Sequence, residues 1–408
     1  MKNLVVLGAG TAGTMMANKL AERLDADWAI TVVDRDDVHL YQPGLLFLPF
    51  GEYSETEIVK ARSPFFPSRV KLDLSGITKV EADAKKVHLG SGETLSYDVL
   101  ILATGSRLVP EQTEGLTGVG WHETAFDFYT LEGAMKLRQA LDGFKEGRLL
   151  VNFVDLPIKC PVAPLEFVFL ADAFFTRRGL RDRVDITYVT PLDAAFTKPR
   201  ASQAFGSMME QRNIALETSF AIEAVDGQKR VLRGYGDREL PYDLLVTVPL
   251  HSGSEAIVDS GLGDELGFVP TDKHTLQTEA YPEVFAIGDA TNLPASKAGS
   301  VAHFQAEVLI ENVMRFIDGR ELDEGFDGHA NCFIETGHGK AMLIDFNYDT
   351  EPLPGKYPLP GVGPFSLLEE SAVNHWGKLG FKWMYWELLL KGKELPVEHR
   401  MSRAGKWF

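Results

Sequence analysis

The chain is poor in cysteine, and its two cysteines, Cys160 and Cys332, are too few for a disulfide framework. If they pair in a cytosolic protein, the bridge is expected to be catalytic rather than structural. The sequence also has no uninterrupted apolar run of about 18 residues, so we expect no segment to span a bilayer. The amino end has no basic stretch followed by a small-residue cleavage site, which predicts a protein that stays in the cytosol.

Positive charge is in the minority. The 408 residues include 41 Lys or Arg and 58 Asp or Glu, which gives a formal net charge of -17. Binding to nucleic acid needs clustered excess cations, so this balance argues against a nucleic-acid partner and leaves a small neutral or anionic substrate. With 45% hydrophobic residues, the chain can bury the cores of two or three domains.

A glycine-rich motif, Gly8-Ala9-Gly10-Thr11-Ala12-Gly13, follows the apolar residues 2–7 and precedes a helical pattern over residues 14–24. Residues 29–33 then form a second apolar run, which Asp34 closes. This order predicts the β-α-β unit of a dinucleotide-binding fold, in which the glycines let the backbone approach a pyrophosphate. Asp34 lies about 20 residues past the loop, where it can accept a hydrogen bond from a ribose hydroxyl.

The second unit of this kind lacks the glycines. A predicted strand over residues 148–154 is followed by residues 155–164, which contain Cys160 and no glycine. A dinucleotide needs glycines here for the close approach of its phosphates. We therefore expect this unit to have exchanged dinucleotide binding for thiol chemistry.

An internal repeat indicates the domain organisation. Residues 86–105 resemble residues 230–249, because each stretch has the pattern of a hairpin, a Tyr-Asp pair and a buried strand. The repeat predicts an α/β chain with two related Rossmann-like domains. The predicted bounds are residues 1–118 with 251–325 for the first domain, 119–250 for an inserted second domain that carries Cys160, and 326–408 for a C-terminal region.

The C-terminal region changes composition twice. Five prolines between residues 352 and 364 predict a linker, since proline cannot continue a helix or a central strand. Residues 376–408 then combine clustered tryptophan and leucine with seven Lys or Arg and three Glu. This pattern favours amphipathic helices on a membrane surface. The alternative is a helix docked on the body of the protein or on a second subunit.

Two further motifs extend the first glycine motif. Ala103-Thr104-Gly105 follows a buried strand, and residues 284–290 have the pattern of a strand that ends in Gly288-Asp289 at a helix start. Together, the three motifs resemble the signature of flavoproteins with two dinucleotide-binding domains. That resemblance implies bound FAD, with Asp34 at the adenosine ribose and Asp289 at the ribityl and phosphate region.

Four further segments make the resemblance more specific. They are residues 159–166 around Cys160, residues 330–337 around Cys332, residues 293–306 and the tail pattern of residues 374–381. Over nearly its whole length the chain is similar to the sulfide:quinone oxidoreductases. The resemblance implies that sulfide is oxidised to protein-bound or released polysulfur at the two cysteines. It further implies that two electrons pass through FAD to a membrane quinone.

The same resemblance implies the site residues. Sulfide attacks a sulfur-sulfur bond between Cys160 and Cys332, and the departing thiolate must be stable near the flavin, with Lys159 and Lys297 as candidate cations. Glu166 is either the proton acceptor for sulfide or a partner of the helix dipole. The candidate cofactor residues are Gly8, Gly10, Thr11, Ala12, Gly13, Asp34, Val80, Ala103, Thr104, Gly105, Gly288, Asp289, Lys297, Ala298 and Gly299. The candidate quinone residues are Phe333, Lys378 and Phe381, and no metal site is expected.

The chain departs from the family pattern at residues 123–129, where many relatives have a third cysteine and this chain has none. We therefore expect noncovalent FAD, and the form of the sulfur product is open. The expected location is peripheral on a membrane, on its cytoplasmic side, and a homo-oligomer is open.

Three alternatives share parts of this pattern. A type II NADH:quinone dehydrogenase would need a glycine-rich loop after the second domain's first strand, which residues 155–164 do not provide. A flavocytochrome-type sulfide dehydrogenase would pass electrons to a haem subunit, usually after export. A non-enzymatic redox-sensing flavoprotein would bind FAD and turn over no quinone.

Overall fold

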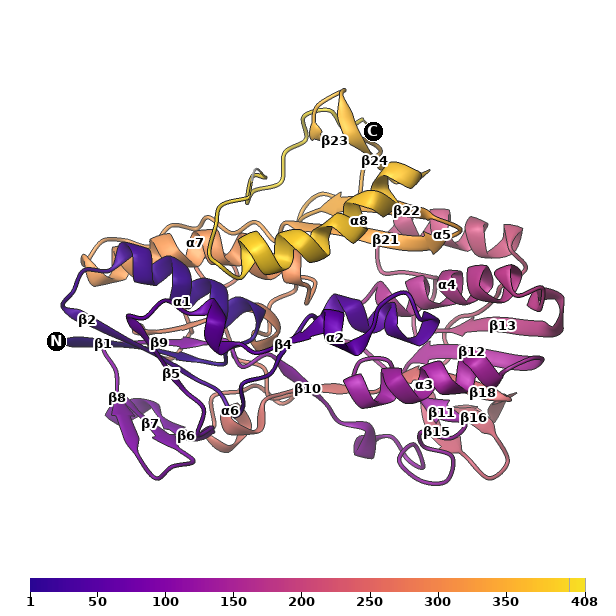
Figure 1. The fold of residues 1–408 in the computed structure, drawn as a ribbon, viewed down its shortest axis with the longest axis horizontal. Coiled ribbons are helices and arrows are strands. Elements are labelled where there is room, and N and C mark those ends of the chain that lie inside the picture. The colour runs from indigo at the N-terminus through magenta and orange to yellow at the C-terminus, as the bar shows by residue number, and fades with distance from the viewer. Residues whose placement is uncertain (396, 408) are drawn as a thin grey trace.

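The first of two parallel sheets forms the amino-terminal half of the molecule. The computed structural model describes residues 1–395 and 397–407. The strand order is β20-β9-β1-β2-β5, all parallel. The strands are β1 (Lys2–Leu7), β2 (Trp28–Val33), β5 (Val70–Asp73), β9 (Val99–Leu102) and β20 (Val284–Ala286). Helices α1 (Thr11–Arg23) and α7 (Gly299–Ile317) pack side by side over this sheet (Figure 1).

The second sheet repeats the plan in the order β11-β18-β12-β13-β14, again all parallel. Its strands are β11 (Ala125–Phe126), β12 (Gly147–Phe153), β13 (Val184–Val189), β14 (Ala215–Glu217) and β18 (Leu244–Val248). Its helices are α3 (Leu131–Gly143), α4 (Ala163–Arg177) and α5 (Pro199–Gln211). Runs of buried apolar residues such as Leu244–Val248 are typical of strands covered on both faces. The prediction of an α/β chain with two Rossmann-like units is confirmed, while the exact domain bounds stay a prediction.

The internal repeat corresponds to two small antiparallel sheets, each of which leads into a central strand. The first consists of β6 (Ile77–Glu81), β7 (Lys86–Leu89) and β8 (Thr94–Ser96), and the second of β15 (Ile222–Asp226), β16 (Val231–Gly234) and β17 (Arg238–Pro241). The two halves are joined where β10 (Ser106–Leu108) pairs antiparallel with β19 (His251–Gly253). Short elements complete these halves: β3 (His39–Leu40), α2 (Glu55–Ile58), β4 (Val59–Lys60) and α6 (Glu255–Asp259).

A third sheet lies across both halves, with α8 over it (Figure 1). Its strands are β21 (Ala330–Gly337), β22 (Lys340–Phe346), β23 (Gly355–Leu359), β24 (Gly363–Leu367) and β25 (Glu370–Ser371). Helix α8 (Ala372–Met384) packs on β21 and β22 and continues into a π-helical turn, Tyr385–Leu389. β21 is an edge strand, so one row of its backbone groups is free to bond elsewhere.

The predicted proline linker is wrong. The proline-rich stretch contains the β23–β24 hairpin, in which Pro358 lies opposite Pro364. Proline is tolerated there because β23 is the outer strand of the sheet, where a missing N–H leaves no neighbour unpaired. The sequence rule did not consider an edge strand, nor a proline near the start of β24, which lies between β22 and β23 but pairs with β22 at Leu367 and not at Pro364.

The second half of the tail is docked on the body of the protein. Tyr385, Trp386, Leu389 and Leu390 are buried in the main hydrophobic core. Trp386 stacks on Phe65 with ring centroids 5.5 Å apart. The docked alternative therefore holds for these residues, and the expectation that they face a membrane is wrong. Within the described residues, no helix combines the length and apolar character needed to cross a bilayer.

Candidate active site

The first glycine loop packs tightly against the protein at Gly8 and Gly13, and it has free space beside Gly10. A Cβ at Gly8 would lie 2.3 Å from the Ala103 carbonyl oxygen, and one at Gly13 would lie 1.8 Å from the Gly8 carbonyl oxygen. A Cβ at Gly10 would meet no atom within 4 Å. The open side lies at the amino end of α1, where Thr11 begins the helix and unpaired N–H groups favour an anion.

Asp34 is held beside this loop. Its Oδ2 accepts a hydrogen bond of 2.6 Å from the Ala9 N–H. It also forms an ion pair with Arg62, whose Nε donates to the Val38 carbonyl at 3.1 Å. No motif indicated Arg62 in the sequence, because the residue that orients an acidic group can come from any part of the chain.

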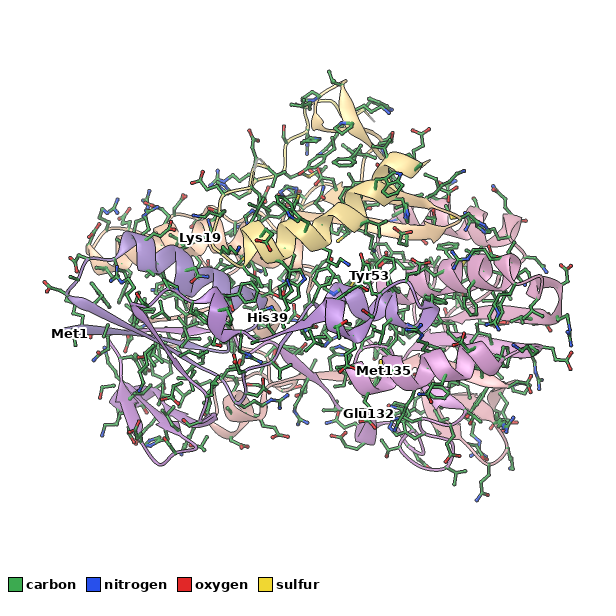
Figure 2. The ribbon with its side chains drawn as sticks, in the orientation of Figure 1. Met1, Lys19, His39, Tyr53, Glu132 and Met135 are labelled. Atoms are coloured by element: carbon green, nitrogen blue, oxygen red, sulfur yellow. The ribbon has the colours of Figure 1, made fainter. Side chains whose placement is uncertain are left out.

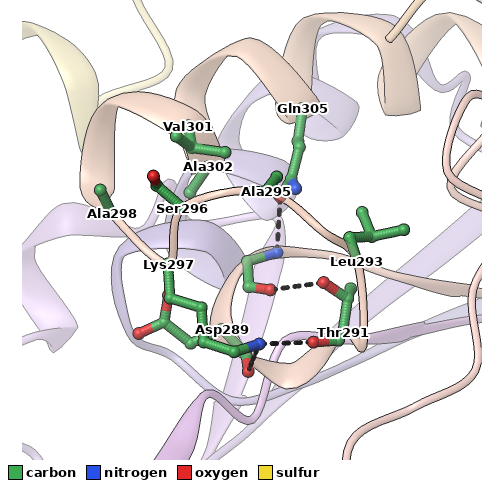
Figure 3. A pocket seen from close by; sticks show the side chains of 11 residues that line it. Asp289, Thr291, Leu293, Ala295, Ser296, Lys297, Ala298, Val301, Ala302 and Gln305 are labelled. Carbon is green, nitrogen blue, oxygen red and sulfur yellow. Dashed lines mark hydrogen bonds between the residues drawn. The ribbon is translucent and has the colours of Figure 1, made fainter. Parts of the chain in front are cut away.

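At the same carboxyl end of the first sheet, after β20, the segment around Asp289 and the start of α7 form a small hollow (Figure 3). Gly288, Asp289, Lys297 and Ala298 line it. Lys297 does not point freely into the hollow, since its Nζ donates to the Asp289 carbonyl at 3.1 Å and the Thr291 carbonyl at 2.5 Å (Figure 3). Burial lowers the pKa of Lys297 to about 8, although Asp289 opposes the shift.

These residues fit a dinucleotide cofactor. Thr104 Oγ1 is buried, and the described residues offer it no hydrogen-bond partner. A Cβ at Gly105 or at Gly299 would meet no atom within 4 Å, so the backbone is accessible at both positions. Val80 differs from the other candidate cofactor residues, because its side chain is buried on β6 and its N–H donates to Ser260 Oγ at 2.8 Å.

Cys160 lies in the glycine-free loop between β12 and α4. Its backbone has φ of +47°, a left-handed conformation that residues other than glycine rarely adopt. The Cys160 N–H donates to the Lys297 carbonyl at 2.7 Å, which ties the thiol loop to the hollow beside Asp289. The Cys160 carbonyl accepts a hydrogen bond of 2.9 Å from the Tyr129 hydroxyl.

Cys332 reaches the same region from β21. Ser300 in the first turn of α7 donates to the Asn331 carbonyl at 2.7 Å, so the strand is fixed beside that helix. Both cysteines are free thiols. Burial and the Glu166 carboxylate raise the pKa of Cys332 to about 12, while Lys378 opposes the shift. Burial, Glu166 and Cys332 likewise raise the pKa of Cys160, and Lys378 again opposes.

A buried ion pair joins α4 to the C-terminal helix, and its charges affect the pKa of both thiols. Glu166, in the first turn of α4, accepts hydrogen bonds from Lys378 Nζ and from the Glu335 N–H, the latter at 2.6 Å. Lys378 Nζ also donates to the Phe333 carbonyl at 2.9 Å. Burial lowers the pKa of Lys378, but Glu166 and Glu335 outweigh it, and the net shift is upward. Lys378 is therefore a charged group, and it stabilises negative charge at either thiol.

The candidate quinone residues lie on the other face of β21. Because side chains alternate along a strand, Phe333 points away from Cys332. The Phe333 ring packs edge-on against Phe365 with centroids 5.0 Å apart. Gly377 of α8 fits over this pair, since a Cβ there would lie 2.5 Å from Phe365 and 2.9 Å from Phe333. Phe381, one turn further along α8, lies 6.3 Å from the Tyr385 ring.

Sequence reasoning missed two contacts around this site. The Tyr385 hydroxyl lies 2.7 Å from Thr11 Oγ1 and 2.7 Å from His39 Nε2, so the tail touches the glycine loop beneath α8, where Figure 2 labels His39. His251 stands edge-on to Tyr129 with centroids 5.6 Å apart, and burial lowers its pKa to about 3. The aromatic cluster of the tail was a sequence signal for the first contact, and no sequence pattern indicated the second.

Comparison with known proteins shows which proteins this chain is similar to. The family described as pyridine nucleotide-disulphide oxidoreductase matches residues 2–151. A mitochondrial sulfide:quinone oxidoreductase of Mus musculus is 28% identical over 396 residues, which cover 95% of this chain and 86% of the mouse protein. That of Schizosaccharomyces pombe is 27% identical over 434 residues, which cover 99% of this chain and 91% of the yeast protein. The chain is therefore similar to the sulfide:quinone oxidoreductases over nearly its whole length.

The fold agrees with this relationship. The solved structure of the sulfide:quinone oxidoreductase from Aquifex aeolicus superimposes with a TM-score of 0.81 at 19% identity, covering 96% of this chain and 92% of that one. In this chain, the stretch that lacks the third cysteine ends at Tyr129. That residue bonds to the Cys160 carbonyl, so the departure from the family pattern lies beside the thiol site.

The glycine loop gives a matched pair of variants. Gly10→Ala is expected to lower FAD affinity about 10- to 100-fold, because its methyl group enters the space needed by a pyrophosphate at a cost of about 1–3 kcal/mol. Folding should be unaffected, since the methyl meets no protein atom. Gly13→Ala should instead lower the thermal midpoint, since its methyl overlaps the Gly8 carbonyl. Flavin fluorescence titration and thermal unfolding test both, and wild-type FAD affinity in Gly10→Ala would contradict the assignment.

Proposed function

We propose that this chain oxidises sulfide at Cys160 and Cys332 and passes two electrons through FAD to a membrane quinone. The supporting observation is the position of the two cysteines. They come from separate parts of the chain, yet the charges of the same two buried residues, Glu166 and Lys378, affect the pKa of both thiols. The Cys160 backbone is also bonded to the loop that lines the proposed flavin hollow.

The sulfur chemistry balances with these groups. The two free thiols first lose two protons and two electrons, for which FAD, when bound, would be the acceptor, and are joined by a sulfur-sulfur bond. Hydrosulfide then attacks this bond, so that a new sulfur-sulfur bond forms on one cysteine and the other leaves as a thiolate. The proton of hydrosulfide passes to the Glu166 carboxylate, and Lys378 stabilises the thiolate. Loss of two electrons from this state restores a sulfur-sulfur bond and leaves the added sulfur as protein-bound or released polysulfur. FAD, when bound, accepts the two electrons.

The proposed cofactor contacts follow the geometry of the loops. The open side of Gly10 and the amino end of α1 would hold the pyrophosphate, and Asp34 would hold the adenosine ribose. Asp289 would bind the ribityl and phosphate region, where burial raises the pKa of its carboxyl against the influence of Lys297 and Lys159. Thr104 Oγ1, which lacks a partner among the described residues, would gain one from the cofactor.

A test is steady-state reduction of a soluble quinone with sulfide as donor and NADH as the parallel donor. Turnover with sulfide alone supports the proposal. Turnover with NADH would favour the type II NADH:quinone dehydrogenase alternative, and transfer to a haem protein but not to quinone would favour the flavocytochrome alternative. Retained FAD without any turnover would favour the redox-sensing alternative.

The quinone is proposed to enter from a membrane beside α8. One face of this helix carries Val373, Trp376, Gly380 and Trp383. The side chains of the two tryptophans are 68% and 61% exposed. Leu359 and Val362 at the β23–β24 hairpin are exposed as well, on the same side of the molecule (Figure 1). The opposite face of α8 carries Lys378 and Phe381. An exposed apolar face with tryptophan is typical of a helix that lies in a membrane interface, here proposed on the cytoplasmic side.

Replacing both Trp376 and Trp383 by alanine is expected to weaken liposome binding at least about tenfold, since each indole that leaves water contributes on the order of 1–2 kcal/mol. Flavin reduction by sulfide should not change. Tyr235→Ala is the matched control, because Tyr235 is 66% exposed next to β16, on the other side of the molecule from α8 (Figure 1). Co-sedimentation measures binding, and equal binding of the double variant and the wild type would place the membrane contact elsewhere.

A further inference from the structure

A second buried carboxyl lies beside the Glu166–Lys378 pair, and the sulfur chemistry does not use it. The Glu335 side chain is 1% exposed. His375 Nδ1 lies 2.9 Å from its Oε1 and 3.1 Å from its Oε2. The His375 side chain is 18% exposed, so the pair runs from a buried position to the surface of α8. A buried carboxyl with an imidazole leading to water is suited to proton transfer.

Glu335 faces the proposed quinone site and not the thiols. It lies two residues after Phe333 on β21, so both side chains point to the α8 side of the strand, while Cys332 points to the other side. The titratable groups that face it are Glu166 from α4, His375 and Lys378 from α8, and Tyr53 from the segment after Phe50. Tyr53 lies under α8 (Figure 2), where Lys382 Nζ stands 4.0 Å from its ring centroid.

We propose that Glu335 donates a proton to the quinone as it is reduced, and that His375 returns a proton from solvent to Glu335. The inference rests on the proposed function and adds the proton route to it. Reduction of a quinone to its quinol adds two electrons and two protons, of which both electrons and one proton would be supplied by FAD when it is bound and reduced. The second proton leaves the Glu335 carboxyl, an O–H bond forms on the quinone oxygen, and the carboxylate recovers its proton through His375.

The chemistry of Glu335 agrees with this role. Burial raises the pKa of its carboxyl to about 7, against Lys378 and His375, which lower it. The carboxyl is therefore protonated below about pH 7 and can donate, whereas an ordinary glutamate would be ionised. As the pH rises through this value the donor is lost, so the proton-dependent step slows on the alkaline side.

The test separates the two half-reactions by stopped flow. In Glu335→Gln, flavin reduction by sulfide is expected within about twofold of wild type, while reoxidation by a soluble quinone falls about 100-fold and loses its dependence on pH near 7. His375→Gln, which retains the carboxyl, should slow reoxidation about tenfold. The matched control is His338→Gln, because His338 also pairs with a carboxylate, at 3.0 Å, but this carboxylate is Asp172 of α4 and not Glu335.

A second readout does not depend on turnover. Infrared difference spectra of the protein between acid and alkaline pH should contain a carboxylic acid band that titrates near 7, is absent in Glu335→Gln and persists in His338→Gln. Reoxidation by quinone at the wild-type rate and pH profile in Glu335→Gln, or an unchanged band, overturns the inference. If sulfide does not reduce the flavin of the wild type, the proposed function itself fails, and the two failures are thereby distinguished.

Discussion

Cys332→Ala is expected to abolish flavin reduction by sulfide, with a loss of roughly 10³-fold or more, while FAD stays bound. Sulfide requires a sulfur-sulfur bond to attack, and a single cysteine offers none. The remaining Cys160 cannot replace that route as a free nucleophile, because burial raises the pKa of its thiol and little thiolate is present near neutral pH. The same result is expected for Cys160→Ala.

Anaerobic stopped-flow absorption measures this loss, and the flavin-to-protein absorbance ratio shows that FAD is retained. Ile334→Val is the matched control, since Ile334 is buried on the same face of β21 as Cys332 and loses one methyl group for about 0.5–1.5 kcal/mol. The control should reduce its flavin at nearly the wild-type rate. Full activity in both cysteine variants would refute the proposed sulfur chemistry.

Lys378→Met is expected to lower the free energy of unfolding by about 3–5 kcal/mol and to suppress quinone reduction. The Glu166 and Lys378 side chains are only 1% and 13% exposed, so removal of the ammonium leaves a buried carboxylate without its counter-charge. The double variant Glu166→Gln with Lys378→Met removes both charges and should recover most of the stability. It should not recover activity, because the stabilising cation at the thiols and at the quinone site is still missing.

Urea unfolding and quinone reduction provide the two measurements. Lys382→Met serves as the control, because Lys382 lies on the same helix but pairs with the half-exposed Glu57 at 2.8 Å. Surface pairs of this kind contribute about 0–1 kcal/mol, so its stability should change little. A Lys378→Met variant as stable as Lys382→Met would mean that the buried pair is not charged.

Local patterns predicted the parts of the fold that local sequence controls. The order of strand, glycine loop, helix and acidic residue predicted β1, α1 and β2 because each feature depends on neighbours within about 20 residues. The absent glycines after β12 predict a loop with a different role, which stays a prediction, while the repeated hairpins were found at both predicted places. The proline stretch was misassigned, since its strands depend on β22, a distant partner.

The candidate site was predictable as a set of residues but not as an arrangement. The sequence analysis left Glu166 as either a proton acceptor for sulfide or a partner of the helix dipole, and it placed Lys378 at the quinone. The two form one ion pair across 212 positions of the chain. Lys297, expected to face the flavin as a free cation, has its ammonium on two backbone carbonyls. Such pairings depend on how distant elements pack together, and no pattern in the local sequence indicates them.

The most direct measurement is the flavin absorption band of the purified protein after anaerobic addition of sulfide, with NADH added to a parallel sample. The account predicts that sulfide bleaches the band, that NADH does not, and that a soluble quinone restores it. These three results together establish the donor, the acceptor and the route through the flavin. Bleaching by NADH and not by sulfide would contradict the account, because the loop that contains Cys160 would then have to bind a nicotinamide without glycines.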